Sequence, residues 1–191
     1  PSVEAVPDEV DLAVVVVPKQ YVLDVVDACG RKGVRGLVVI TAGFKEVGGE
    51  GLERERALME KVREYGMRMV GPNCMGILNT APDYAMNATF APTMPPQGPS
   101  SFLSQSGALG VTILDYAAEY GIGIHHFVSV GNKPDVSGND LLEYWEDEPG
   151  TKVILMYLEN FGNPRRFTRI ARRVTRKKPI VVVKSGRTSA G

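Results

Sequence analysis

The residues best suited to hold an anion are Ser-Gln-Ser-Gly at positions 104–107, between a short apolar run and the start of a helical pattern. Two serine hydroxyls, an unhindered glycine backbone and the free N–H groups of a first helical turn can together hold a phosphate, which the positive end of the helix dipole also favours. Serine is equally a common helix N-cap, so simple capping is the alternative. The motif predicts a phosphate site formed by Ser104, Gln105, Ser106 and Gly107.

A second cluster, Gly-Pro-Asn-Cys-Met-Gly at residues 71–76, directly follows a predicted strand. It therefore belongs at the carboxyl edge of a parallel sheet, where such folds bind ligands. Asn73 could orient a polar ligand group at this edge. Cys74 has no His or acidic neighbour in the sequence, so a small packed hydrophobic residue fits it better than a nucleophile.

Two further predicted strands end at the same edge of the sheet. Val17 and Pro18 end the first, and Ile40, Thr41 and Ala42 end the second. Their backbone groups and small side chains would suit a flat ligand, although by themselves they are only strand ends.

Glu159 ends another apolar run, at residues 153–158. A carboxylate at that edge could orient a catalytic imidazole, and an exposed loop acid is the alternative. Lys133 follows a further predicted strand and could meet an anion. The two histidines, His125 and His126, lie inside a strand pattern and point to opposite faces, which favours a structural role.

The elements that position these residues alternate between strand and helix, because continuous β-branched runs alternate with apolar residues at helical spacing. Strands are predicted at residues 11–17, 36–41, 67–70, 100–103, 124–130, 153–158 and 179–184, and helices at 20–32, 51–65, 108–120, 140–145 and from Pro164, after an Asn163 cap. Residues 80–99 hold five prolines and little periodicity, which indicates a linker or a covering segment. We therefore expect an α/β fold with two doubly wound parallel-sheet domains, residues 1–95 and 96–191.

The composition is that of an ordinary globular protein: 191 residues, 43% of them hydrophobic, with 22 basic and 22 acidic side chains. The balanced charge speaks against a nucleic-acid binder, and no apolar run approaches the ~20 residues that cross a bilayer. Cys29 and Cys74 can form neither a disulfide scaffold nor a zinc site, so we expect no metal site and a reducing cytoplasm. Residues 163–178 hold eight basic side chains and no acid, which predicts a solvated helix face or, alternatively, a docking surface for an acidic partner.

In this order, the motifs resemble the nucleoside-diphosphate-forming acyl-CoA synthetase superfamily, which includes succinyl-CoA synthetase and ADP-forming acetyl-CoA synthetase. The resemblance spans nearly the whole chain and is closest to the ADP-forming acetyl-CoA synthetase branch and to the similar half of bacterial protein acetyltransferases. It rests on Val-Val-Pro at residues 16–18, Ile-Thr-Ala-Gly at 40–43, Gly-Pro-Asn-Cys-Met-Gly at 71–76, Ser-Gln-Ser-Gly at 104–107, Ser-Val-Gly-Asn-Lys at 129–133 and Tyr-Leu-Glu at 157–159.

The resemblance implies a Rossmann-like CoA-binding domain that lacks its N-terminal part, followed by a flavodoxin-like domain of the succinyl-CoA-ligase type. In the family, acyl-CoA and phosphate give an acyl phosphate, whose phosphoryl group passes through a phosphohistidine to ADP, bound with Mg on an ATP-grasp domain or subunit. The implied protein is a cytoplasmic oligomer that uses CoA and a small carboxylate. By the resemblance, CoA would be touched by Val17, Pro18, Ile40, Thr41, Ala42, Asn73 and Cys74, the phosphoryl group would be cradled by residues 104–107, and the catalytic histidine would be hydrogen-bonded by Glu159.

Two departures from the family bear on activity. The family's catalytic histidine follows the Lys-Ser-Gly-Arg-Thr segment, which is at residues 184–188 here, and neither His125 nor His126 occupies its place. We therefore expect an interior piece of a longer enzyme, inactive by itself. Where succinyl-CoA synthetases are expected to carry Tyr, this chain has Val111, which favours a small monocarboxylate.

Two other functions stay open as alternatives. A noncatalytic CoA-binding regulatory module, such as the synthetase-like half of a protein lysine acetyltransferase, is the main one. A nicotinamide dehydrogenase on the same fold is disfavoured, because the sequence contains no glycine-rich dinucleotide fingerprint.

Overall fold

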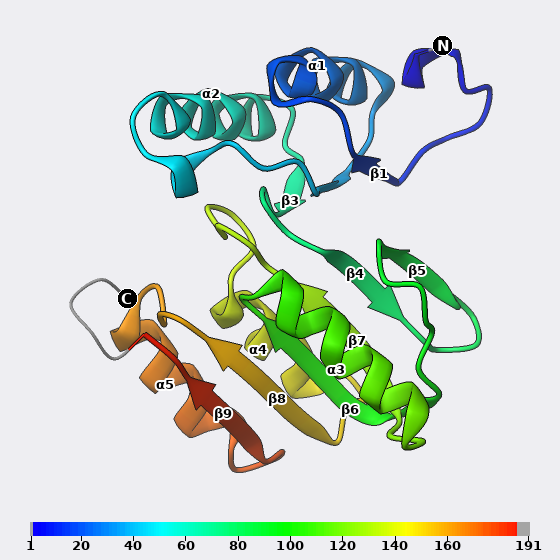
Figure 1. Ribbon diagram of the computed structural model, residues 1–191, viewed down its shortest axis with the longest axis vertical. Helices are drawn as coiled ribbons and strands as arrows, with labels where there is room; N and C mark the ends of the chain where they lie inside the picture. Colours follow the sequence, from blue (N-terminus) through cyan, green and yellow to red (C-terminus); the bar gives the residue numbers. More distant parts are fainter. Residues whose placement is uncertain (1, 187–191) are drawn as a thin grey trace.

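The computed structural model describes residues 2–186, and within them the strands form two sheets. One sheet has three strands in the order β1-β2-β3, and the other has six in the order β5-β4-β7-β6-β8-β9. Figure 1 shows the two sheets and their helices at opposite ends of the molecule. The expected α/β class is confirmed.

The first sheet is parallel throughout and carries its helices on one face. The elements are Leu12–Val15 (β1), Val22–Lys32 (α1), Gly36–Val39 (β2), Glu50–Glu64 (α2) and Arg68–Val70 (β3), with 3-10 helices at Val3–Ala5, Lys19–Tyr21 and Lys45–Val47. Both crossovers step in the same direction along the sheet, so α1 and α2 lie side by side (Figure 1). They approach closely because Gly30 has no side chain: a Cβ there would lie 2.3 Å from Cγ of Tyr65.

The second sheet is doubly wound, as predicted. Its elements are Gly76–Asn79 (β4), Met86–Thr89 (β5), Gln97–Ser104 (β6), Gly107–Glu119 (α3), Ile124–Ser129 (β7), Gly138–Asp147 (α4), Val153–Leu158 (β8), Pro164–Val174 (α5) and Ile180–Lys184 (β9). β7, β6, β8 and β9 are parallel to one another. In Figure 1, α3 lies in front of this sheet and α4 and α5 lie behind it, so each face has its own apolar core.

The interpretation of residues 80–99 as a linker is wrong. β5 and the start of β6 lie within this segment, and β4 pairs antiparallel with both β5 and β7. Pro99 lies where the pairing of β6 with β7 is irregular, and the other four prolines fall outside strands, so the composition concealed two short strands. The two sheets divide between β3 and β4. A domain boundary after residue 95 stays a prediction, and residues 187–191 of the second domain lie outside the described residues.

The basic segment is only partly a solvated face. Asn163 caps α5 by accepting a hydrogen bond from the N–H of Arg166, and Pro164 is the first helical residue, as predicted. The Arg166 guanidinium lies 2.7 Å from a carboxylate oxygen of Glu143, on α4, and Arg173 makes a similar contact on the same helix. Arg166 and Arg173 therefore form ion pairs with carboxylates of α4. Within residues 2–186, no helix combines the length and apolar character that crossing a membrane requires.

Candidate active site between the two sheets

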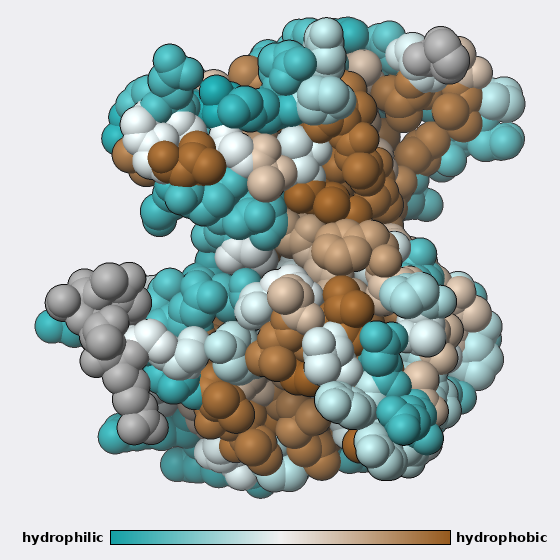
Figure 2. Space-filling view, in the orientation of Figure 1, coloured by the Kyte–Doolittle hydropathy of each residue, from teal (hydrophilic) through white to brown (hydrophobic). Residues whose placement is uncertain are grey.

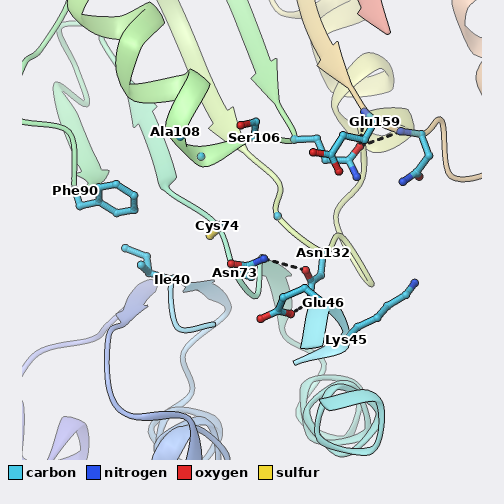
Figure 3. A pocket seen from close by; sticks show the side chains of 14 residues that line it. Ile40, Lys45, Glu46, Asn73, Cys74, Phe90, Ser106, Ala108, Asn132 and Glu159 are labelled. Carbon is cyan, nitrogen blue, oxygen red and sulfur yellow. Dashed lines mark hydrogen bonds between the residues drawn. The ribbon is translucent and has the colours of Figure 1, made fainter. Parts of the chain in front are cut away.

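A cavity of about 820 Å³ lies where the two sheets meet. Figure 2 shows that the surface is indented between the two lobes, and Figure 3 shows the cavity from close by. The residues around it come from both halves of the chain: Ile40, Lys45, Glu46, Asn73, Cys74, Phe90, Gln105, Ser106, Gly107, Ala108, Gly131, Asn132, Glu159 and Asn160.

Most of these residues follow the carboxyl ends of parallel strands. Ile40 follows β2, Asn73 follows β3, Gln105 follows β6, Asn132 follows β7 and Glu159 follows β8. The carboxyl edges of the two sheets therefore face each other across one space. Open α/β sheets bind their ligands at this edge, and here two such edges share a single cavity.

The N-terminus of α3 forms one end of the cavity. Ser106 is its N-cap, with an oxygen that accepts a hydrogen bond from the N–H of Leu109 at 3.4 Å. Ser106 and Gly107 also line the cavity, so capping and anion binding are compatible rather than alternative roles. Ser104 lies outside the lining and is buried; its hydroxyl donates to the Ser106 carbonyl at 2.6 Å. Ser104 thus shapes the turn that presents Ser106.

Gln105 ties three loops together beside the helix N-terminus. Its Oε1 accepts hydrogen bonds from Lys133 Nζ at 2.9 Å and from the backbone N–H groups of Glu159 at 3.1 Å and Asn160 at 3.3 Å. Lys133 Nζ also donates to the Asn160 carbonyl at 2.6 Å. These contacts hold Glu159 at the cavity rim next to the N-terminus of α3 (Figure 3).

Lys133 lies outside the cavity lining but is hydrogen-bonded to Gln105, which lines it, and burial lowers the pKa of its ammonium group to about 8. The cation is present below that pH and is lost above it. We expect the affinity for sulfate, a dianion that does not itself titrate in this range, to fall about five- to tenfold between pH 7 and pH 9.5. Calorimetric titration of the intact protein measures this. Lys133→Met should bind sulfate weakly at every pH, and an unchanged pH slope in this variant would contradict the assignment.

The predicted CoA-contacting residues divide into two groups. Ile40, Asn73 and Cys74 line the cavity. Outside its lining lie Val17, Pro18, Thr41 and Ala42. The hydroxyl of Thr41 donates to the Val17 carbonyl at 2.7 Å, which fixes the two neighbouring strand ends to each other. Contact of these residues with CoA stays a prediction.

Seven lining residues were not among the predicted site residues: Lys45, Glu46, Phe90, Ala108, Gly131, Asn132 and Asn160. Gly131 and Asn132 belong to the Ser-Val-Gly-Asn-Lys motif, and Ala108 and Asn160 directly follow predicted residues. Lys45 and Glu46 lie in the 3-10 helix that follows the Ile-Thr-Ala-Gly strand end, so extending that motif by a few residues would have found them. Phe90 directly follows β5, a strand that the proline-rich composition concealed. Its ring points toward the cavity from the side opposite Glu159 (Figure 3).

Cys74 lines the cavity but is a poor nucleophile. The side chain is buried, its thiol donates to the Val39 carbonyl at 3.3 Å, and burial raises its pKa to about 12. This agrees with the expectation that Cys74 is a small packed residue. At pH 8 only about one thiol in 10,000 is a thiolate.

We therefore expect iodoacetamide to leave Cys74 unmodified in the native protein at pH 8, and to modify it fully once the chain is unfolded in urea. Mass spectrometry after a timed quench measures both. Cys74→Ala should retain turnover to within about threefold, since the thiol has no chemical role. Rapid native alkylation accompanied by loss of turnover would contradict this.

The two histidines lie away from the cavity. His125 Nε2 is 3.2 Å from a carboxylate oxygen of Glu148, and the His126 ring stacks on Trp145 with centroids 6.5 Å apart. Burial lowers the pKa of His126 to about 4, so this imidazole is neutral at physiological pH. Neither side chain lines the cavity. Over residues 2–186, no group of three or more His, Cys, Asp or Glu side chains is placed to hold a metal ion.

Two family models match the chain. A CoA binding domain matches residues 1–80, and a succinyl-CoA ligase like flavodoxin domain matches residues 97–191. These domains and the shared cavity define the class: an α/β protein with a CoA-binding half and a ligase-type half.

Known relatives place the chain within that class. It is 47% identical over 191 residues to acetate–CoA ligase [ADP-forming] I of Archaeoglobus fulgidus, covering 100% of this chain and 28% of that protein. It is 46% identical over 190 residues to the α subunit of acetate–CoA ligase [ADP-forming] I of Pyrococcus furiosus, covering 100% of this chain and 41% of that subunit.

A solved structure is also similar to this chain over its whole length. The dinucleotide forming acetyl-coenzyme A synthetase 1 of Ca. Korarchaeum cryptofilum, in complex with phosphate and ADP, superposes with a TM-score of 0.93 at 48% identity, covering 100% of this chain and 41% of that chain. The chain belongs to the nucleoside-diphosphate-forming acyl-CoA synthetase superfamily. It spans less than half the length of these relatives.

Proposed function

We propose that the intact protein is an ADP-forming acyl-CoA synthetase, which interconverts acyl-CoA, ADP and phosphate with a carboxylate, CoA and ATP. The observation that carries the proposal is the shared cavity. Ile40 and Asn73, from the half that matches a CoA binding domain, line the same space as Ser106 and Gly107 at the N-terminus of α3. A reaction between a thioester and phosphate requires both to be held side by side.

The first chemical step follows from this arrangement. An oxygen of hydrogen phosphate attacks the thioester carbonyl, the carbon–sulfur bond breaks, and the departing thiolate takes the proton that the phosphate gives up. The products are an acyl phosphate and CoA. The N-terminus of α3 would hold the phosphate oxygens, and the nearby charge of Lys133 would offset their negative charge. In this proposal the chain's residues act by positioning and by charge.

The later steps need groups from outside this chain. Because neither His125 nor His126 lines the cavity, the histidine that takes the phosphoryl group would enter from elsewhere in the protein. Glu159, at the rim beside the N-terminus of α3, would hydrogen-bond its imidazole. ADP or ATP, with Mg, would bind an ATP-grasp domain or subunit, in an oligomeric assembly. A cytoplasmic location is supported by two buried free thiols.

An acetate-like acyl group is the substrate that we propose. The relatives reported above are named as acetate–CoA ligases and an acetyl-coenzyme A synthetase. Val111, on α3, is partly buried against the apolar core of that helix and presents no polar group to a second carboxylate. A small monocarboxylate therefore fits better than succinate.

The decisive experiment is to incubate the intact protein with labelled ATP and test for phosphate on the protein that is labile to acid and stable to base. Label that acetate and CoA discharge together would support the synthetase. Binding of CoA without any incorporation of phosphate would overturn it and favour the regulatory module. As a control, Glu159→Gln should retain CoA binding while the yield of phosphoprotein falls.

A further inference from the structure

The side-chain amide of Asn132 is held by two carboxylates from the first half of the chain. Its Nδ2 donates to Glu46 Oε2 at 2.6 Å and to Glu55 Oε2 at 2.8 Å. Glu46 lies on the cavity, and Glu55 is a buried residue of α2. Both N–H bonds of this amide are thereby engaged.

The ionised carboxylate of Glu46 fixes which way the Asn132 amide faces. Burial alone raises the pKa of Glu46, but hydrogen bonds from Asn132 and from the N–H groups of Gly43 and Phe44 outweigh it, and the net pKa is lowered. An ionised carboxylate only accepts hydrogen bonds, so the nitrogen of Asn132 must face Glu46 and Glu55. The oxygen of Asn132 then faces the other way.

That oxygen sets the orientation of a second amide. Asn73 Nδ2 donates to Asn132 Oδ1 at 3.3 Å. Asn73 therefore turns its nitrogen toward Asn132 and its oxygen away, toward the cavity that it lines (Figure 3). The backbones are fixed as well, because the Asn132 N–H donates to the Pro72 carbonyl and the Asn73 N–H to the Thr41 carbonyl, each at 3.0 Å.

We propose that Asn132, locked by Glu46 and Glu55, is a positioning residue that presents the Asn73 carbonyl oxygen to the cavity as a hydrogen-bond acceptor. The group it receives is an N–H donor, of the kind found in the amide-containing arm that carries the thiol of CoA. The inference deepens the proposed function and rests on CoA being the ligand. It assigns a positioning role to Asn132, Glu46 and Glu55, which act through Asn73.

The test is CoA affinity, measured by calorimetry on the intact protein. Asn73→Ala and Asn132→Ala should each weaken CoA binding about five- to twentyfold, the range expected for one well-placed hydrogen bond. Because Asn132 acts through Asn73, the double variant should bind no more weakly than Asn73→Ala alone. Fully additive losses would show that Asn132 acts independently and would overturn the proposal.

The carboxylates provide a second and isosteric test. Glu55 lies outside the cavity lining, and in Glu55→Gln the Glu46 carboxylate still requires the nitrogen of Asn132, so CoA affinity should change less than about threefold. The double variant, Glu46→Gln with Glu55→Gln, removes the constraint and should weaken binding as much as Asn132→Ala does. Glu53→Gln with Glu60→Gln, on the exposed side of α2, is the matched control and should have no effect. Thermal melting of each variant separates loss of binding from loss of folding.

The outcomes are separable from those of the proposed function. If the unaltered protein binds CoA and the double glutamine variant, still folded, binds it equally well, the positioning role is wrong and the synthetase proposal stands. If the unaltered protein does not bind CoA at all, both fail.

Discussion

Gly107→Ala is expected to lower phosphate-dependent turnover about 100-fold while leaving the melting temperature of the protein unchanged or slightly higher. Gly107 is the first residue of α3 and lines the cavity. A Cβ at this position would meet only the Cβ of Met75, at an ordinary contact distance of 3.8 Å. The protein itself therefore tolerates a methyl group here, and alanine stabilises a helix by up to about 1 kcal/mol relative to glycine. Under the proposed function, the methyl group would take space that the phosphate occupies.

Gly110→Ala, one turn further along α3, is the matched control and should behave in the opposite way. A Cβ there would lie 2.7 Å from Cζ of Phe127 and 3.0 Å from Sδ of Met75, both in the core. This variant should lose stability but, where folded, keep its affinity for phosphate. Steady-state kinetics with varied phosphate, beside thermal melting, measures both properties. Normal turnover in Gly107→Ala would mean that the phosphate lies elsewhere.

Gly131→Ala should destabilise the protein by about 3 kcal/mol and abolish ligand binding at the junction of the two sheets. Gly131 has φ near +54°, in the left-handed region that favours glycine. A Cβ there would lie 2.2 Å from the Pro72 carbonyl oxygen and 2.4 Å from that of Asn73. These are backbone atoms of the loop that carries Asn73, so relief of the clash must move the cavity wall.

Gly121→Ala separates the cost of the left-handed backbone conformation from the cost of the clash. Gly121 has a similar φ of +66°, but no atom lies within 4 Å of an added Cβ. It should therefore show only the backbone cost, about 1 kcal/mol, with unchanged ligand binding. Urea unfolding gives both free energies. Equal losses in the two variants would mean that close packing between the loops contributes nothing.

Much of the fold was predictable because its signals are local. The continuous apolar run that begins at Leu12 marks β1, and the Asn163-Pro164 cap marks the start of α5. The β4 and β5 hairpin was not predictable. Its strands have four residues each and lack a continuous apolar run, and β4 is held in the sheet by pairing with β7, far away in the sequence.

The site, too, was only partly predictable from the sequence. The Ser-Gln-Ser-Gly motif was visible because it occupies one turn and the start of the helix that follows it, and Ser106 and Gly107 lie together on the cavity. Ser104, in the same motif, is buried and supports the turn instead. Residue type and spacing identify the motif, but they do not state which of its side chains point outward.

The sequence by itself determined the alternation of strands and helices, the family, and the motifs at the strand ends, because each of these depends on neighbouring residues. Only the tertiary structure decided that the carboxyl edges of two sheets share one cavity, and that Glu46 and Glu55 reach Asn132 and, through it, orient Asn73. Glu46 and Asn132 are 86 positions apart in the chain. A hydrogen bond over that separation leaves no local pattern, since it exists only once both sheets have formed and met.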